Sequence, residues 1–220
     1  MSLDEITFSS PHYIFHFAEG SFAHREIDRI VREQESAWTK ITGLLQVTPF
    51  FKISYYLMDT PEQVGAAYGD NEPMNGFARL PDKVYAVYNQ QVQCVGPHED
   101  AHLIAKLVGH PESAFIREGL AMYFDETWWG KPNKAWVADY LGDGSYLPLS
   151  KLLSNKEFYS LPDSLTYPIA GAFTQYLIEA FGIEKYLAFY AQAVSDPVFA
   201  MNKHFQSLPQ LEKGFKKWVP

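Results

Sequence analysis

The part of the chain before Gln90 contains short runs of aromatic and β-branched residues. Runs of this kind, bounded by Gly, Pro and Asp, are typical of β-strands. Pro81 and Asp82 separate the last two runs, which indicates a β-hairpin or two adjacent strands. The predicted strands are His12–Ala18, Phe50–Met58, Gly76–Leu80 and Lys83–Tyr88.

Two helices are predicted among these strands. The longer one spans Phe22 to about Leu45, because its apolar residues recur at steps of three and four. Ser21 is a suitable N-cap for it. A shorter helix begins at Thr60-Pro61-Glu62, with proline at the first helical position, and ends by Gly69.

From Pro97 onward the pattern becomes helical, which places strands early and helices late in an α+β arrangement. We therefore expect an N-terminal lobe over residues 1–90 and a helical lobe over residues 91–220, joined as one catalytic unit. Ser207 and Gln210 have the spacing of a capping box. The predicted helices are Pro97–Val108, Glu112–Trp128, Asn133–Leu141, Leu149–Leu153, Tyr167–Phe181, Glu184–Ala193 and Leu208–Trp218.

The composition is that of a folded protein, with 220 residues, 47% hydrophobic and 20% charged. The net charge of −8 and the lack of a Lys/Arg run argue against nucleic acid as the main partner. No segment reaches the roughly 18 apolar residues of a membrane span. We expect a monomer.

The single cysteine, Cys94, cannot form an intramolecular disulfide, which fits a reducing compartment. A buried structural thiol is the expected role. No basic segment followed by an apolar stretch marks a signal peptide at the start. We therefore expect a cytoplasmic protein, although a leader absent from this sequence stays open.

The strongest chemical signal is His98-Glu99-Asp100-Ala101-His102, an H-E-x-x-H sequence. Residues four apart share one face of a helix, so both imidazoles can point at one ion. Glu99 lies one position round the helix, where it can hold a metal-bound water without binding the metal. Catalytic zinc usually has three protein ligands and an open position, so a further ligand is needed.

Glu118 is the natural third ligand. It follows His102 by sixteen residues, beyond a break at Gly109-His110-Pro111. This gap allows a turn and a second helix that returns past the first. Gly119 would let the backbones of these two helices approach closely.

These motifs resemble the gluzincin metallopeptidases, specifically the small peptidase MA-like domains. The resemblance is carried by residues 98–102, by Arg117–Glu126 (REGLAMYFDE) and by Tyr167–Phe173 (YPIAGAF), and it spans nearly the whole chain. It implies a zincin-like fold with zinc held by His98, His102 and Glu118. Tyr167 resembles the tyrosine that donates to the developing oxyanion in related enzymes, although an ordinary packing tyrosine is the alternative.

The sequence departs from the family pattern in places. Gly96-Pro97 directly precedes His98, and Met122 stands where a carboxylate often orients a ligand histidine. Asp125 and Asp100 are the candidates to replace that carboxylate. The spacing from His102 to Glu118 is also short compared with that of the larger gluzincin peptidases.

The sequence therefore predicts a zinc-dependent, peptidase-like hydrolase in which Glu99 activates a metal-bound water for amide hydrolysis. Its substrate would be a peptide or protein. Gly76, Phe77 and Ala78 are candidates for a sheet edge that binds it as an added strand, although an ordinary hairpin strand is the alternative. A non-catalytic peptide- or protein-binding domain on the same scaffold is the rival function, and a metal sensor is a weaker one.

Overall fold

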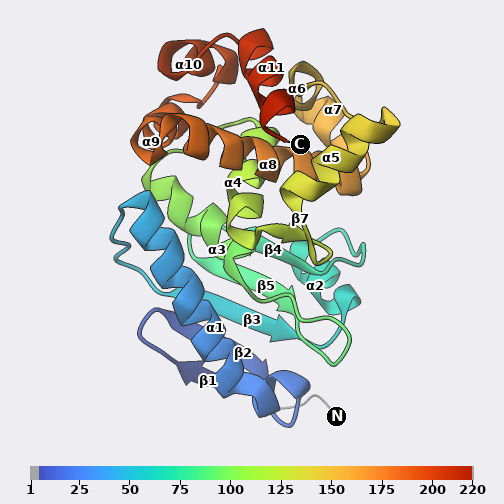
Figure 1. The fold of residues 1–220 in the computed structure, drawn as a ribbon. Helices are drawn as coiled ribbons and strands as arrows, with labels where there is room; N and C mark the ends of the chain where they lie inside the picture. The colour runs from blue at the N-terminus through green and yellow to red at the C-terminus, as the bar shows by residue number, and fades with distance from the viewer. Residues whose placement is uncertain (1–4, 220) are drawn as a thin grey trace. The chain divides into compact units, whose positions relative to one another are not determined.

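The computed structural model describes residues 5–219 and has the predicted α+β architecture, with a mixed sheet and a long helix first and mostly helices afterwards (Figure 1). Contacts between residues divide the chain into two compact units, one ending at Ile104 and the other beginning at Ala105. The expected lobes of residues 1–90 and 91–220 stay a prediction.

Within residues 5–219, five strands form the sheet, in the order β1-β2-β3-β5-β4. The three inner strands are parallel, whereas β1 and β4 lie antiparallel at the two edges. The four predicted strands are confirmed with slightly shorter bounds, and β1 was not predicted. The sequence run that begins at Phe50 enters the sheet only at Ile53, since Phe50 itself is 92% exposed. The strands are β1 Glu5–Ser9, β2 Tyr13–Ala18, β3 Ile53–Met58, β4 Gly76–Arg79 and β5 Lys83–Val87.

Alternate side chains of the inner strands face a buried core on one side of the sheet. Tyr13 and Tyr55 belong to this core, and the Tyr13 ring contacts Trp38 of the long helix. The core thus lies between the sheet and helix α1. The other sheet face carries four aromatic rings stacked from strand to strand, with centroids 4.3–4.9 Å apart: His16, Tyr56, Tyr85 and Phe77.

The described part of the first unit, residues 5–104, also contains three helices. They are α1 Phe22–Leu45, α2 Pro61–Tyr68 and α3 Pro97–Ile104. The N-cap expected at Ser21 is present, because Ser21 Oγ accepts from the backbone N–H of His24. Helix α2 begins at Pro61 as predicted, and Thr60 Oγ1 caps it by accepting from the backbone N–H of Gln63. Helix α3 is shorter than predicted, since the chain tightens into a 3-10 turn at Ala105–Leu107.

The second unit is built from helices and one small hairpin. The predicted helix over residues 112–128 ends at Asp125, where Glu126 adopts a left-handed φ of 64° and the hairpin begins. The Ser207–Gln210 capping box is confirmed, and the two short helices α7 and α10 were not predicted. The elements are α4 Ala114–Asp125, β6 Thr127–Trp128, β7 Lys131–Pro132, α5 Asn133–Asp143, α6 Leu149–Leu152, α7 Asn155–Ser160, α8 Asp163–Phe181, α9 Ile183–Gln192, α10 Pro197–His204 and α11 Leu208–Trp218.

Helix α8 is the central helix of this unit, and it contains a proline. Pro168 has no N–H to donate to the carbonyl of Ser164, four residues earlier. The Tyr140 hydroxyl of α5 donates to that carbonyl instead. The helix therefore continues past the proline with the missing hydrogen bond replaced. None of the helices among residues 5–219 is long and apolar enough to cross a bilayer.

Candidate metal centre

The two histidines of the H-E-x-x-H motif project from the same side of α3. Their ring centroids lie 5.1 Å apart with planes at 79°, and both side chains are partly exposed. The residues between them differ in environment, because Glu99 is partly exposed whereas Asp100 and Ala101 are buried. One face of this short helix therefore carries the potential ligands, and the other joins the core.

Helix α4 carries Glu118, which is 8% exposed. The side chain of Asn155 caps the start of this helix, accepting from the backbone N–H of Ala114 at 2.7 Å. Gly119 does allow a close helix contact, but with α8. A Cβ at this position would lie 2.6 Å from Thr174 Oγ1 and 2.8 Å from the carbonyl oxygen of Ala170.

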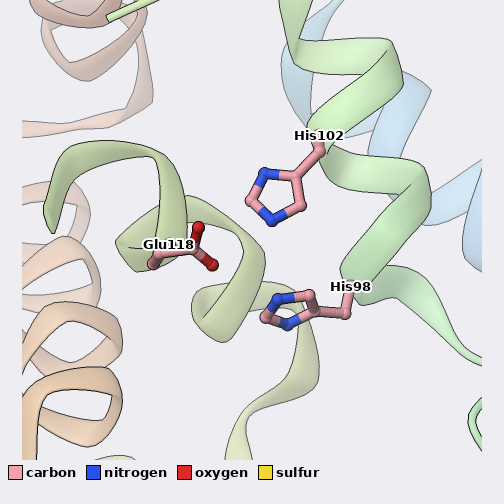
Figure 2. Close-up of side chains that lie close together, drawn as sticks. All are labelled: His98, His102 and Glu118. Atoms are coloured by element: carbon pink, nitrogen blue, oxygen red, sulfur yellow. The ribbon is translucent and has the colours of Figure 1, made fainter. Parts of the chain in front are cut away.

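The structure brings the three sequence-predicted ligands together. His98, His102 and Glu118 each offer one ligand atom, and these atoms all lie within 4.8 Å of one another. Figure 2 shows the two imidazoles and the carboxylate turned toward one another. Ligand atoms around a tetrahedral zinc ion lie roughly 3–4 Å apart. The limit of 4.8 Å on the distances between these three ligand atoms is slightly longer than that separation. The chain thus has a His/His/Glu group that could hold a metal ion.

Glu99 lies beside the edge strand of the sheet. A Cβ built on Gly76 would come within 3.6 Å of Glu99 Oε1, so the carboxylate and the start of β4 are neighbours. Phe77 points to the opposite sheet face, where it stacks on Tyr85. Because side chains alternate along a strand, the small residues Gly76 and Ala78 share the face on which Glu99 lies. Their role in substrate binding stays a prediction.

Tyr167 lies in the first half of α8 and is partly buried. Its ring contacts Trp128 at a centroid distance of 5.4 Å and Phe158 at 5.6 Å. These two aromatic contacts orient the ring within the helical unit. Its proposed donation to an oxyanion stays a prediction.

The residues considered as replacements for the missing carboxylate have different environments. Met122 is fully buried, and its Cβ faces Gly171 of α8, so this position belongs to the core. Asp100 accepts hydrogen bonds from Tyr13 and Gln34 through Oδ2, while Oδ1 has no hydrogen-bond partner in residues 5–219. Asp100 therefore does not orient a ligand imidazole by a direct hydrogen bond. The role of Asp125 stays a prediction.

Burial controls the ionisation of the groups behind α3. It raises the pKa of the Asp100 carboxyl well above the usual value, although the hydrogen bond from Tyr13 acts in the opposite direction. Burial and the neighbouring Asp100 together raise the pKa of Tyr13, so its hydroxyl stays protonated and donates. Burial also raises the pKa of Cys94, a half-buried free thiol that is not part of the His/His/Glu group.

The sequence matches no protein-family model, and no curated protein matches it significantly. The arrangement of two histidines on one helix and a glutamate downstream is consistent with a zincin-like site.

Sequence reasoning did not select Gln34, which the structure places behind the metal motif. The side chain is completely buried on α1, although glutamine is usually exposed. A signal was available, because Gln34 interrupts the apolar stripe formed by Ile30, Ala37, Trp38 and Ile41. A polar residue in such a stripe requires a buried hydrogen-bond partner.

Proposed function

We propose that this protein is a zinc-dependent, peptidase-like hydrolase of the gluzincin type. The observation that carries the proposal is the convergence of His98, His102 and Glu118 within 4.8 Å. Two imidazoles and one carboxylate are a ligand set of catalytic zinc sites, which keep a further position open for water or substrate. A structural zinc site is normally closed by four protein ligands.

Glu99 is the proposed general base. It adjoins His98 in sequence, it is partly exposed, and its carboxylate lies beside Gly76. Zinc bound to the three ligands would lower the pKa of its water toward about 7 and polarise the scissile carbonyl. Glu99 would accept a proton at its carboxylate and return it to the leaving amine.

The proposed substrate is an extended peptide or protein segment. Strand β4 ends the sheet order, so its outer backbone groups face no further strand within residues 5–219. An extended peptide could pair with this edge and gain main-chain hydrogen bonds. Gly76 and Ala78 would leave space for the peptide on the side of Glu99, and Tyr167 would donate to the oxyanion.

The first prediction concerns the metal. Purified protein should contain about one equivalent of zinc, and His102→Ala should lose most of it because a ligand is removed. Metal content by inductively coupled plasma mass spectrometry measures this. His24→Ala is the control, since His24 lies on α1 and accepts from the backbone N–H of Gly20. Full zinc content in His102→Ala would place the metal elsewhere and overturn the proposed site.

The second prediction concerns catalysis. Glu99→Gln keeps the size of the side chain and removes the base, so hydrolysis should fall by roughly 10²-fold or more while zinc content stays unchanged. Cleavage of a mixed fluorogenic peptide library measures the loss. Equal rates in the parent and Glu99→Gln would remove Glu99 from the mechanism.

A non-catalytic peptide- or protein-binding domain is the second candidate function. The burial of Met122 favours it, because no carboxylate lies one turn after Glu118. Zinc in both the parent and Glu99→Gln, without hydrolysis by either, would support this candidate over the hydrolase. Retention of Glu99 argues for hydrolysis, since a purely structural metal has no use for a general base.

A further inference from the structure

We propose that Gln34 and Asp100 are positioning residues of the metal centre, which together hold the first turn of α3 in the orientation that points His98 toward the metal. This inference rests on the proposed zinc site. It adds a role for two buried polar side chains that neither bind the metal nor touch the substrate in the proposed mechanism.

The start of α3 needs an anchor. The helix has eight residues, and His98 lies in its first turn, directly after Pro97. The first backbone N–H groups of a helix have no partner within it, and helix ends fray. Gly96, the residue before the helix, has a φ of 132°, a conformation that side-chain-bearing residues rarely adopt.

Gln34 supplies the anchor through its carboxamide. Its Oε1 accepts from the backbone N–H of Gly96 at 2.6 Å, and its Nε2 donates to the carbonyl oxygen of Gly96 at 3.2 Å. Nε2 also donates to Asp100 Oδ2 at 3.0 Å. One fully buried side chain of α1 therefore binds the backbone before α3 and a side chain within its first turns.

Tyr13 connects this pair to the sheet. Its hydroxyl donates to Asp100 Oδ2, and it also lies 2.9 Å from the carbonyl oxygen of Gln34. Strand β2, helix α1 and helix α3 thus share one hydrogen-bonded cluster. All of its members lie in the first unit of the chain.

The geometry of a helix transmits this anchoring to the ligands. Each residue turns the helix by about 100°, so Asp100, two residues from both histidines, lies on roughly the opposite side. Holding Asp100 in the core fixes the rotation of α3, and holding Gly96 fixes where the helix begins. Functional groups must be held to within roughly 0.5 Å and 10–20° of their working geometry, which a fraying first turn does not provide.

Burying the polar groups of this cluster costs free energy, which supports a role in orienting α3 and not in stabilising the fold. Burying a carboxyl and a carboxamide removes them from water, and well-packed apolar side chains of similar volume are often as stable or more stable. Asp100 Oδ1 also lacks a hydrogen-bond partner in residues 5–219. An apolar pair would fill the core without fixing the rotation of the helix.

The test begins with Gln34→Met, which keeps the length of the side chain and removes its hydrogen bonds to Gly96 and Asp100. Zinc affinity, measured by competition with a chromophoric chelator, should weaken by roughly 10–100-fold, the usual effect of losing support for metal ligands. The visible absorption of the cobalt-substituted protein should change, because it reports ligand geometry. In the metal-free protein, hydrogen exchange should accelerate at residues 98–103 and stay unchanged in the strands.

A pair of variants at Asp100 separates hydrogen bonding from charge. Asp100→Asn retains an oxygen that can accept from Gln34 and Tyr13, so zinc affinity should stay near that of the parent. Asp100→Ala removes the acceptor and should weaken affinity as Gln34→Met does. Equal losses in Asp100→Asn and Asp100→Ala would show that charge matters and would overturn the positioning role.

Further variants guard against loss of the fold. Tyr13→Phe removes one hydroxyl from the cluster and should produce a smaller change in the same direction, even if Gln34→Met does not fold. Tyr88→Phe is the matched control, because the buried Tyr88 hydroxyl has no hydrogen-bond partner in residues 5–219. It should leave zinc affinity and exchange in α3 unchanged.

The outcomes distinguish this inference from the proposed function. A parent that binds zinc through His102, together with Gln34→Met and Tyr13→Phe variants of unchanged affinity and exchange, would overturn the positioning role alone. A parent without zinc would overturn the proposed function. Exchange in the metal-free variants would then still decide whether the cluster anchors α3, since uniform acceleration throughout the unit would contradict it.

Discussion

Helices α3 and α4 supply the ligands of the candidate metal centre, and different interactions hold each helix in place. Behind α3 lies a buried polar cluster in which Gln34 and Tyr13 hold Asp100 by hydrogen bonds. Helix α4 packs most extensively on α8, and Gly119 lets the two backbones approach closely. Buried hydrogen bonds fix the orientation of the groups that they join, but the polar groups lose their contacts with water, which costs free energy. Close packing excludes water and adds dispersion contacts, so it contributes mainly to stability.

This difference predicts different responses to mutation. Variants in the polar cluster behind α3 should change the metal site more than the stability of the unit. Variants in the contact between α4 and α8 should change the free energy of unfolding first.

Gly119→Ala should destabilise the protein by about 1–3 kcal/mol, because the new Cβ would lie 2.6 Å from Thr174 Oγ1 and 2.8 Å from a backbone oxygen. Urea unfolding followed by circular dichroism measures the change. Gly43→Ala is the control, since no atom lies within 4 Å of a Cβ at that exposed position of α1. The control should be neutral or stabilising by up to about 1 kcal/mol. Equal effects in the two variants would refute close packing at Gly119.

Tyr140→Phe should cost about 1 kcal/mol, because it removes the donor that replaces the missing N–H of Pro168. The loss tests whether the second unit also depends on a specific polar contact. Urea unfolding measures the cost, and Tyr68→Phe is the control, because Tyr68 is 52% exposed. No difference between the variants would indicate that water satisfies the Ser164 carbonyl equally well.

The sequence predicted the elements whose pattern is local. The long helix α1, the inner strands and the H-E-x-x-H helix follow from spacing and caps, and the structure confirms them. The short helices α7 and α10 were missed, because six or eight residues give too little periodicity for a pattern to stand out. Strand β1 was missed because it lies at a sheet edge and four of its five residues are exposed.

The candidate site was predictable in its ligands but not in its support. His98 and His102 share a helix face, so their convergence follows from sequence alone. The helix predicted to pack against Gly119 was wrong. The structure places α8 there, and nothing in the sequence distinguishes a contact with α8 from one with α3. The link from Gln34 to Gly96 joins residues 62 positions apart, and only the fold brings them together.

The smallest predicted effect concerns Glu35, the neighbour of Gln34 on α1. Its carboxylate accepts from Ser10 Oγ at 2.6 Å and from the backbone N–H of His12 at 3.0 Å, and it lies 2.6 Å from His12 Nδ1. These contacts tie the helix that anchors α3 to the turn before β2. Burial alone would raise the pKa of Glu35, but the hydrogen bonds from Ser10 and His12 outweigh it and lower the pKa.

The lowered pKa gives a stabilisation that depends on pH. A carboxyl whose pKa is lower in the folded state than in the unfolded state contributes its full stabilisation above the unfolded value of about 4.5. This contribution is lost as the pH falls through the lower, folded value. At neutral pH we expect it to be below about 1 kcal/mol, because the contact is partly exposed to solvent.

Urea unfolding of the parent and of Glu35→Gln, from about pH 6 down to about pH 3, tests this expectation. The difference in unfolding free energy should be largest near pH 6 and should shrink as the pH falls below about 4.5. Glu33→Gln removes a neighbouring carboxylate on α1 whose ion-pair partner, Arg29, lies on the same helix, and it controls for net charge. A difference that stays constant over this range would show that the ionised form of Glu35 does not hold α1 to the turn. The attachment of α1 to the sheet would then depend on apolar contacts such as that between Trp38 and Tyr13. Polar support of the kind described for α3 would not extend to α1.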